Sequence, residues 1–163
     1  MRMTGKCIKC NKRTQGRNDN NFICRNCNQI RKFTRMTELL RNMDPFDFGW
    51  LIGLIEGEGC FYKKGSKCKL RDGIYCYPLS GFTLMSTDLD VMKKFANLLN
   101  VDLAGPYYKQ RQNERKVVWS VQITGNISVA IMKEVREFLG ERRNMQIDEA
   151  LEWQNRGRFK IEN

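Results

Sequence analysis

The segment from Asp44 to Phe61, DPFDFGWLIGLIEGEGCF, constrains the fold more than any other part of the chain. Its glycines recur at every fourth residue (Gly49, Gly53 and Gly57), so they lie on one face of a helix. Each glycine costs a helix about 1 kcal/mol relative to alanine, and a helix that carries this cost gains by letting another backbone approach closely. The other positions are mostly apolar, so we expect the helix to be buried.

Both ends of this helix carry polar signals. Asp44 is a good N-cap, and Pro45 occupies the first helical position, where proline has no N–H to lose. At the other end, Glu56 and Glu58 place carboxylates against the negative end of the helix dipole, and Gly59 follows them. This arrangement makes sense if a cation lies there. The alternative is a buried helix that ends in a solvated acidic turn.

The stretch from Leu51 to Gly59, LIGLIEGEG, resembles the LAGLIDADG motif of homing endonucleases, which introns and other mobile elements encode. Glutamate replaces aspartate at Glu56 and Glu58. The resemblance covers roughly residues 44–155, because the order of the expected downstream elements also fits. It implies a saddle-shaped domain with the element order αββαββα.

The resemblance also implies a site and an assembly. In that family, motif helices of two protomers or two repeats pack at the dimer interface, which places Gly49, Gly53 and Gly57 there. The eighth motif position holds catalytic metal, so Glu58, with Gly57 beside it, is the expected site for Mg²⁺ or Mn²⁺. Since the chain has one motif and no internal repeat, a homodimer is needed to pair these acids. Divalent metals can hydrolyse DNA without histidine, which the chain lacks.

Further catalytic candidates come from the same resemblance. A basic residue of the family lies near the scissile phosphate, between the last two helices, where this chain has Arg142 and Arg143. A polar side chain that positions water ends the second strand, where this chain has Ser86. Arginine is a poorer proton donor than the lysine of the family, and serine is shorter than glutamine. With these residues the scaffold could have kept DNA binding and lost cleavage.

A separate motif precedes this domain. Cys7 and Cys10 form one C-x2-C pair, and Cys24 and Cys27 form a second. Such pairs supply the four soft ligands of structural zinc, whose binding would also fold a loop too polar to form a core. Disulfides are the alternative for these cysteines.

Positive charge is concentrated in the same region. Residues 1–43 hold 11 Lys/Arg and 2 acids, a net of +9, whereas residues 44–163 hold 18 and 16, a net of +2. We therefore expect a basic zinc-binding module and linker in residues 1–43, followed by an endonuclease-like domain in residues 44–163. A basic arm on a nearly neutral body favours nucleic acid as the partner, most simply double-stranded DNA.

A membrane is the competing polyanion. The arm lacks the apolar face that interfacial helices need, and no run of about 18 apolar residues is present to span a bilayer. The first residues, MRMTGKC, contain no apolar signal segment, so we expect an intracellular protein that is not secreted.

The downstream pattern predicts an α+β fold. We expect strands over 60–64 and 74–86, a helix over 88–99, a hairpin over 105–125, and helices over 126–139, capped by Asn126, and 141–155. Alternation on the last strand points Ser120, Gln122 and Thr124 outward, where they can read base edges or form an ordinary wet sheet face.

Basic residues gather in three places that could contact DNA. The first is the segment 28–43, which carries Arg31, Lys32 and Arg35. If this segment is a helix that lies along nucleic acid, these residues contact phosphates; the alternative is that the segment is a solvated connector. The other two clusters are expected at hairpin tips: Lys63, Lys64, Lys67, Lys69 and Arg71 in the first, and Lys109, Arg111, Arg115 and Lys116 in the second.

The sequence thus favours a dimeric, site-specific and metal-dependent DNA endonuclease. Two alternatives remain: a DNA-binding regulator or maturase-like RNA-binding protein that has lost cleavage, and a zinc-stabilised protein-interaction module. The role of three further cysteines, Cys60, Cys68 and Cys76, is also open. They could form a second metal site, be buried as small hydrophobic residues, or be thiols on the surface.

Overall fold

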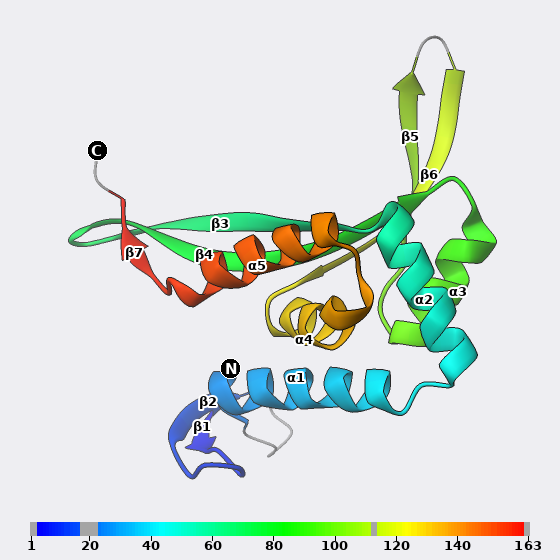
Figure 1. The fold of residues 1–163 in the computed structure, drawn as a ribbon. Helices are drawn as coiled ribbons and strands as arrows, with labels where there is room; N and C mark the ends of the chain where they lie inside the picture. Colours follow the sequence, from blue (N-terminus) through cyan, green and yellow to red (C-terminus); the bar gives the residue numbers. More distant parts are fainter. Residues whose placement is uncertain (1–2, 17–22, 112–113, 162–163) are drawn as a thin grey trace.

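The computed structural model describes residues 3–16, 23–111 and 114–161, and Figure 1 shows their arrangement. The fold is α+β, as predicted, with helices packed on one face of an antiparallel sheet. None of the helices in these ranges combines the length and apolarity that crossing a bilayer requires.

The elements follow the predicted order from the motif helix onward. The helices of the domain are α2 (Pro45–Glu58), α3 (Leu89–Leu99), α4 (Asn126–Val135), the short 3-10 helix η1 (Arg136–Phe138) and α5 (Glu141–Asn155). The strands are β3 (Cys60–Leu70), β4 (Gly73–Ser86), β5 (Ala104–Arg111), β6 (Glu114–Thr124) and β7 (Phe159–Lys160). The N-terminal arm contains β1 (Met3–Lys6), β2 (Arg13–Gly16) and α1 (Arg25–Arg41).

Several predicted boundaries were wrong. The region predicted as a basic turn after residue 64 is mostly strand, because β3 pairs with β4 without interruption as far as Leu70. Gly125, with φ of 71°, occupies the N-cap position of α4, so Asn126 is the first helical residue instead of the cap. That helix ends at Val135 and continues as η1. The strand β7 was not predicted at all.

The sheet has the order β3-β4-β6-β5, and β7 pairs with the part of β4 that β6 does not cover. Directly paired residues point to the same face. Lys63 pairs with Ser80, and both contact α5, through Glu149 at 2.8 Å and Gln154 at 2.7 Å respectively. This face is therefore covered by helices. We call the opposite face, on which Lys64 lies and which the described helices leave uncovered, the open face.

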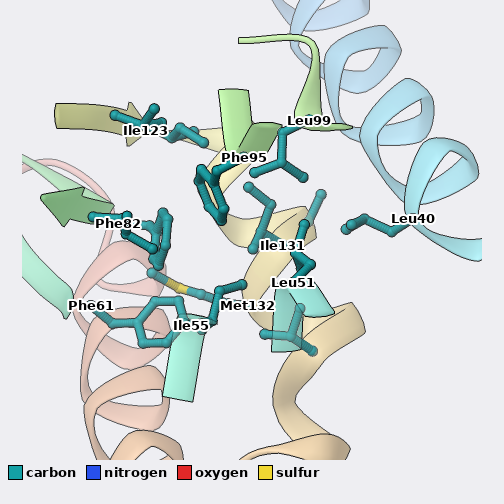
Figure 2. Packing of buried hydrophobic residues seen from close by; sticks show 14 of the residues in the cluster. Leu40, Leu51, Ile55, Phe61, Phe82, Phe95, Leu99, Ile123, Ile131 and Met132 are labelled. Atoms are coloured by element: carbon teal, nitrogen blue, oxygen red, sulfur yellow. The ribbon is translucent and has the colours of Figure 1, made fainter. Parts of the chain in front are cut away.

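The core lies between the sheet and the helices (Figure 2). Phe82 is fully buried, with ring centroids of Phe61 and Phe95 at 5.1 and 5.9 Å. From α2, Leu51 and Ile55 enter the same cluster with no exposed surface. Burying one such side chain stabilises the fold by about 1.5–3 kcal/mol, so this cluster fixes where α2 lies.

The expectation that α2 is buried all round was wrong for the single chain. Phe46 is 89% exposed, and a Cβ atom built on Gly49, Gly53 or Gly57 meets nothing within 4 Å. The glycine face of α2 is therefore uncovered among the described residues, while the opposite face holds the core.

The arm docks on the helical side of the domain. The helix α1 packs against α4, which lies between α1 and the sheet (Figure 1). Met36 and Leu40 are buried in the core cluster, and Arg41 makes a bidentate ion pair with Glu134 of α4 at 2.8 and 2.9 Å. The predicted helix after the cysteines is thus present, and one side of it is a packing surface.

Candidate metal centre and nucleic-acid interface

The four N-terminal cysteines come together where the hairpin β1–β2 meets the start of α1. The connection between the two strands carries Cys7 and Cys10 and is closed by backbone hydrogen bonds from Cys7 N to Lys12 O and from Asn11 N to Cys7 O, each 2.8 Å long. Cys24 is the N-cap of α1, and its sulfur accepts from the backbone N–H of Cys27 at 3.5 Å.

The geometry of these sulfur atoms fits a metal such as zinc. All four Sγ atoms lie within 4.8 Å of one another, and those of Cys10 and Cys24 are 3.6 Å apart. Tetrahedral zinc with Zn–S bonds of about 2.3 Å separates its sulfur ligands by about 3.8 Å. The proposed pairing of the motifs into one site is therefore spatially sound, and every ligand position of a tetrahedral metal is supplied by protein.

Two of these cysteine thiols have pKa values shifted in opposite directions by their neighbours. The backbone hydrogen bond from Cys24 is the main cause that lowers the pKa of Cys7 to about 6. Hydrogen bonds with Cys10 and then Cys24 raise the pKa of Cys27 to about 12. Four thiolates this close together repel one another, so ionising all of them is unfavourable unless a cation takes the place of the shared protons.

The remaining cysteines form no comparable group. Cys60 and Cys68 are exposed, while Cys76 is buried. Within the part of the chain that the structure describes, the cluster in the arm is the one set of three or more potential ligands close enough to hold a metal. A second cysteine site thus has no support.

The C-terminal end of α2 carries a different kind of charge cluster. The Glu56 carboxylate accepts a hydrogen bond from Gly140 N at 2.9 Å, at the start of α5. Arg143 is 5% exposed, and its guanidinium donates to the carbonyl oxygens of Glu56, at 2.9 and 3.0 Å, and Gly57, at 3.0 Å. The negative end of the α2 dipole is therefore compensated by a positive charge, and that charge is the guanidinium of Arg143.

The other acid of the motif is differently placed. Glu58 is exposed, and none of the described residues forms a hydrogen bond or ion pair with its carboxylate. Arg142 is exposed nearby, with Nη2 3.5 Å from Glu56 O. The structure therefore brings Glu58 and Arg142 to the same end of α2, while Arg143 is committed to holding that end.

Ser86 lies at the end of β4, where its hydroxyl accepts from Asp88 N at 3.1 Å ahead of α3. The register pairs Cys60 with Thr83, so Glu58 and Ser86 lie toward the same end of the β3–β4 pair. The Ser86 side chain thus stabilises the turn that leads into α3, at the end of the strand pair toward which Glu58 also lies.

The open face carries the outward positions of β6. Gln122 is exposed and donates to the Tyr62 hydroxyl at 2.8 Å, and Thr124 is exposed opposite Gly81. Ser120 points to this face but is only 9% exposed. The predicted alternation is present, and it leaves Gln122 and Thr124 more available to a ligand than Ser120.

The first basic cluster is split by strand alternation. Lys63, Lys67 and Lys69 share the helix-side orientation, since Lys63 pairs with Ser80 and Lys67 with buried Cys76. Lys64 lies on the open face, and exposed Arg71 is in the turn between β3 and β4. The expectation that the whole cluster occupies a hairpin tip was wrong, because all four lysines lie within β3 and only Arg71 is in the turn.

The second cluster is partly described. Lys116 is exposed on β6, where it pairs with Lys109 of β5. The side chains of Lys109, Arg111 and Arg115 lie outside the described part of the structure, although their backbones belong to the β5–β6 hairpin (Figure 1).

Basic residues at the C-terminal end join the open face and were missed by sequence reasoning. Lys160 of β7 pairs with Tyr75, and the Arg158 guanidinium lies 4.9 Å from the centre of the Tyr75 ring. A hydrogen bond with Tyr77 raises the pKa of Arg158. A strand as short as β7 has no periodic signal; the alternation of Arg156, Arg158 and Lys160 was the one available hint.

A scan against protein-family models found no family that matches this chain, and a search of curated proteins found no match either. The functional assignment therefore depends on the residues and geometry described above.

We expect one zinc ion per chain, held by the four-cysteine cluster. Replacing Cys10 with serine should lower the bound zinc several-fold and unfold the β1–β2 hairpin, because metal binding supplies the folding energy of such modules. Elemental analysis of purified protein measures the zinc. The matched control is Cys68→Ser, which removes an exposed cysteine of β3 and should retain a full complement of metal. Equal zinc in both variants would contradict the assignment.

Replacing Arg143 with glutamine should destabilise the fold by about 2–3 kcal/mol, because it removes the charged donor from part-buried carbonyl oxygens at the end of α2. Arg142→Gln, at the exposed neighbouring position, should change the free energy of unfolding by less than about 0.5 kcal/mol. Urea unfolding followed by circular dichroism measures both. Similar losses in the two variants would show that the buried contacts carry no special weight.

Proposed function

We propose that this protein is a LAGLIDADG-type DNA endonuclease, a homodimer that hydrolyses phosphodiester bonds at a specific site with Mg²⁺ or Mn²⁺. The observation that carries the proposal is the position of Glu58. It is an exposed carboxylate at the end of a helix whose other motif acid is already engaged in the fold. An acid left at this position has no structural task that the described contacts reveal.

The uncovered glycine face of α2 supports a dimer. Gly49, Gly53 and Gly57 have open space where side chains would be, and Phe46 extends the same side with 89% of its surface exposed. A helix that is fixed by its core face and bare on a small-residue face suits close packing against a second copy. Such packing would bring the Glu58 carboxylates of two chains near each other.

The carboxylates fit a hard divalent cation. Mg²⁺ prefers oxygen ligands and commonly binds through one or two carboxylates together with substrate phosphates. Glu58 from each protomer would supply protein oxygens, whereas the Gly57 carbonyl already accepts from Arg143. The bound metal would activate water and stabilise the charge that develops on the phosphate. Arg142 is exposed at the same end of α2 and would add positive charge there.

The open face supports nucleic acid as the substrate. It presents Lys64, Gln122, Thr124 and the pair Arg158–Lys160 on a curved sheet from which the β5–β6 hairpin projects (Figure 1). Lysine and arginine contact phosphates, and glutamine and threonine can hydrogen-bond base edges in the major groove. Such a protein would act inside the cell, and its zinc would be structural.

One observation favours a second candidate, a regulator or maturase-like protein that binds nucleic acid without cutting it. The Ser86 hydroxyl, expected to position water, is already an acceptor for Asp88 N. If water is left unpositioned, the scaffold would retain binding and lose cleavage. The two candidates differ in whether Mg²⁺ yields broken DNA.

Replacing Glu58 with glutamine should abolish cleavage, by at least about 100-fold, and leave binding within a few-fold, because an amide is a poor metal ligand with the same shape. Purified protein and a randomised duplex library are incubated with Mg²⁺, and retained and broken molecules are sequenced. The matched control is Glu56→Gln, whose side chain can still accept from Gly140 N, and which should keep cutting. DNA breaks that persist in Glu58→Gln would contradict the proposal. Enrichment of one site by the wild type without any breaks would establish the non-cutting candidate.

Replacing Gly53 with alanine should have opposite effects on folding and association. It should stabilise the isolated chain by about 1 kcal/mol, since alanine is the better helix former and its Cβ meets nothing within 4 Å. It should weaken the dimer at least tenfold, because the added methyl group keeps the facing backbone away. Chemical unfolding and sedimentation equilibrium measure the two quantities. A dimer of unchanged strength would place the interface elsewhere.

A further inference from the structure

The zinc module and the exposed side of α1 carry a basic surface that the proposed cleavage does not use. Residues 1–43 have a net charge of +9, and four thiolates with one Zn²⁺ add −2, which leaves about +7. Lys9, Arg31 and Arg35 line a cavity of about 350 Å³ between the zinc module and α1, which also has one acid, Glu38, in its wall. Lys32 is exposed on the adjoining part of α1, so these four basic residues outnumber the acid. We call Lys9, Arg31, Lys32 and Arg35 the arm surface.

The arm surface lies across the molecule from the open face. The open face is on the side of the sheet opposite to α4, and α1 lies beyond α4 (Figure 1). The order through the molecule is therefore open face, sheet, α4, then α1 with the zinc module. A duplex seated on the open face of one chain is separated from that chain's arm surface by the sheet and the helical layer.

The docking of α1 keeps the arm in this position. Leu40 is 2% exposed and Met36 6%, so releasing α1 from the domain would return both apolar side chains to water. The Arg41–Glu134 ion pair and the Lys133 ammonium, 5.7 Å from the Phe33 ring centre, add to this contact. The three residues between α1 and α2 are too few to carry the arm around the domain.

We propose that the arm surface binds a second segment of double-stranded nucleic acid, so that the protein holds two duplex segments at once. The proposal rests on the proposed function for the first segment, on the open face. Arg31 and Arg35 lie one helical turn apart, about 6 Å, which lets each contact a different phosphate of one strand. A duplex fits this surface better than an acidic protein does, because the charges extend along a helix face and continue onto the zinc module.

A capture assay tests whether two duplexes are held together. Full-length zinc-loaded protein, without Mg²⁺, is added to a duplex fixed on beads, chosen as the site enriched from the library, and a fluorescent duplex of unrelated sequence is then supplied. The wild type should retain the fluorescent duplex, and R31Q/K32Q/R35Q should retain at least tenfold less. The same variant should bind the fixed duplex within a few-fold of the wild type. Capture that is unchanged in the variant, or absent in the wild type, would overturn the proposal.

Salt dependence supplies a matched comparison on single charges. Lys32→Gln should lower the slope of log Kd against log salt for the unrelated duplex by about 0.9, the value for one phosphate contact. Lys93→Gln, which removes an exposed helical lysine of α3, should leave the slope unchanged. Equal slopes for the two variants would refute the arm surface as the binding site.

The outcomes also separate this proposal from the proposed function. If no site is enriched and nothing is cut, while duplex binding still depends on Arg31, Lys32 and Arg35, the nuclease proposal fails and duplex binding by the arm stands. If the arm variant instead loses affinity for the fixed duplex and no second duplex is ever captured, both surfaces act on one duplex and the present proposal fails. Arm-dependent binding to vesicles rich in anionic lipid, without capture of duplex, would also overturn it.

Discussion

The junction between the end of α2 and the start of α5 is the contact on which the rest of the structure depends. It is reciprocal: Arg143 of α5 donates to the last carbonyl oxygens of α2, and the Glu56 side chain of α2 accepts from Gly140 N at the start of α5. Each helix thus places a charge of the favourable sign at the other's terminus, where Glu56 O, Gly57 O and Gly140 N gain side-chain hydrogen bonds. Since α5 lies under β3 and β4, this junction also sets where the motif helix meets the sheet.

The same junction shows what sequence reasoning could and could not reach. The spacing of glycines and acids located the helix, its Asp44 cap and the need for a positive charge at its end, because these depend on local rules. It could not identify the cation, since Arg143 is 87 residues from Glu56 along the chain and is brought there by tertiary packing. The cysteine cluster was predictable for the opposite reason: the short spacings within each pair nearly define the site.

The alternation of residues along the strands and the order of the elements could also be predicted from the sequence, whereas the distribution of charge over the two faces of the sheet could not. A cluster such as Lys63, Lys64, Lys67 and Lys69 reads as one patch along the sequence, but a long strand sends its members to both sides of the sheet. Placement of the arm was likewise hidden, because the residues that dock α1 look like an ordinary amphipathic pattern until α4 is seen to receive them. The two-residue strand β7 falls below the length at which periodicity carries information.

The position of β3 gives its lysines a further consequence. In the described sheet β3, with 11 residues, ends the strand order, and no described strand pairs with its outer edge. One backbone group of β3 is engaged by a helix instead, since Lys64 O accepts from Trp153 Nε1 of α5 at 2.9 Å. Such an edge is a template for adding a strand from another molecule, and lysines along it oppose that growth by charge repulsion and hydration. The lysines of β3 are therefore expected to oppose aggregation independently of any ligand, and replacing all of them together should promote association through this sheet edge.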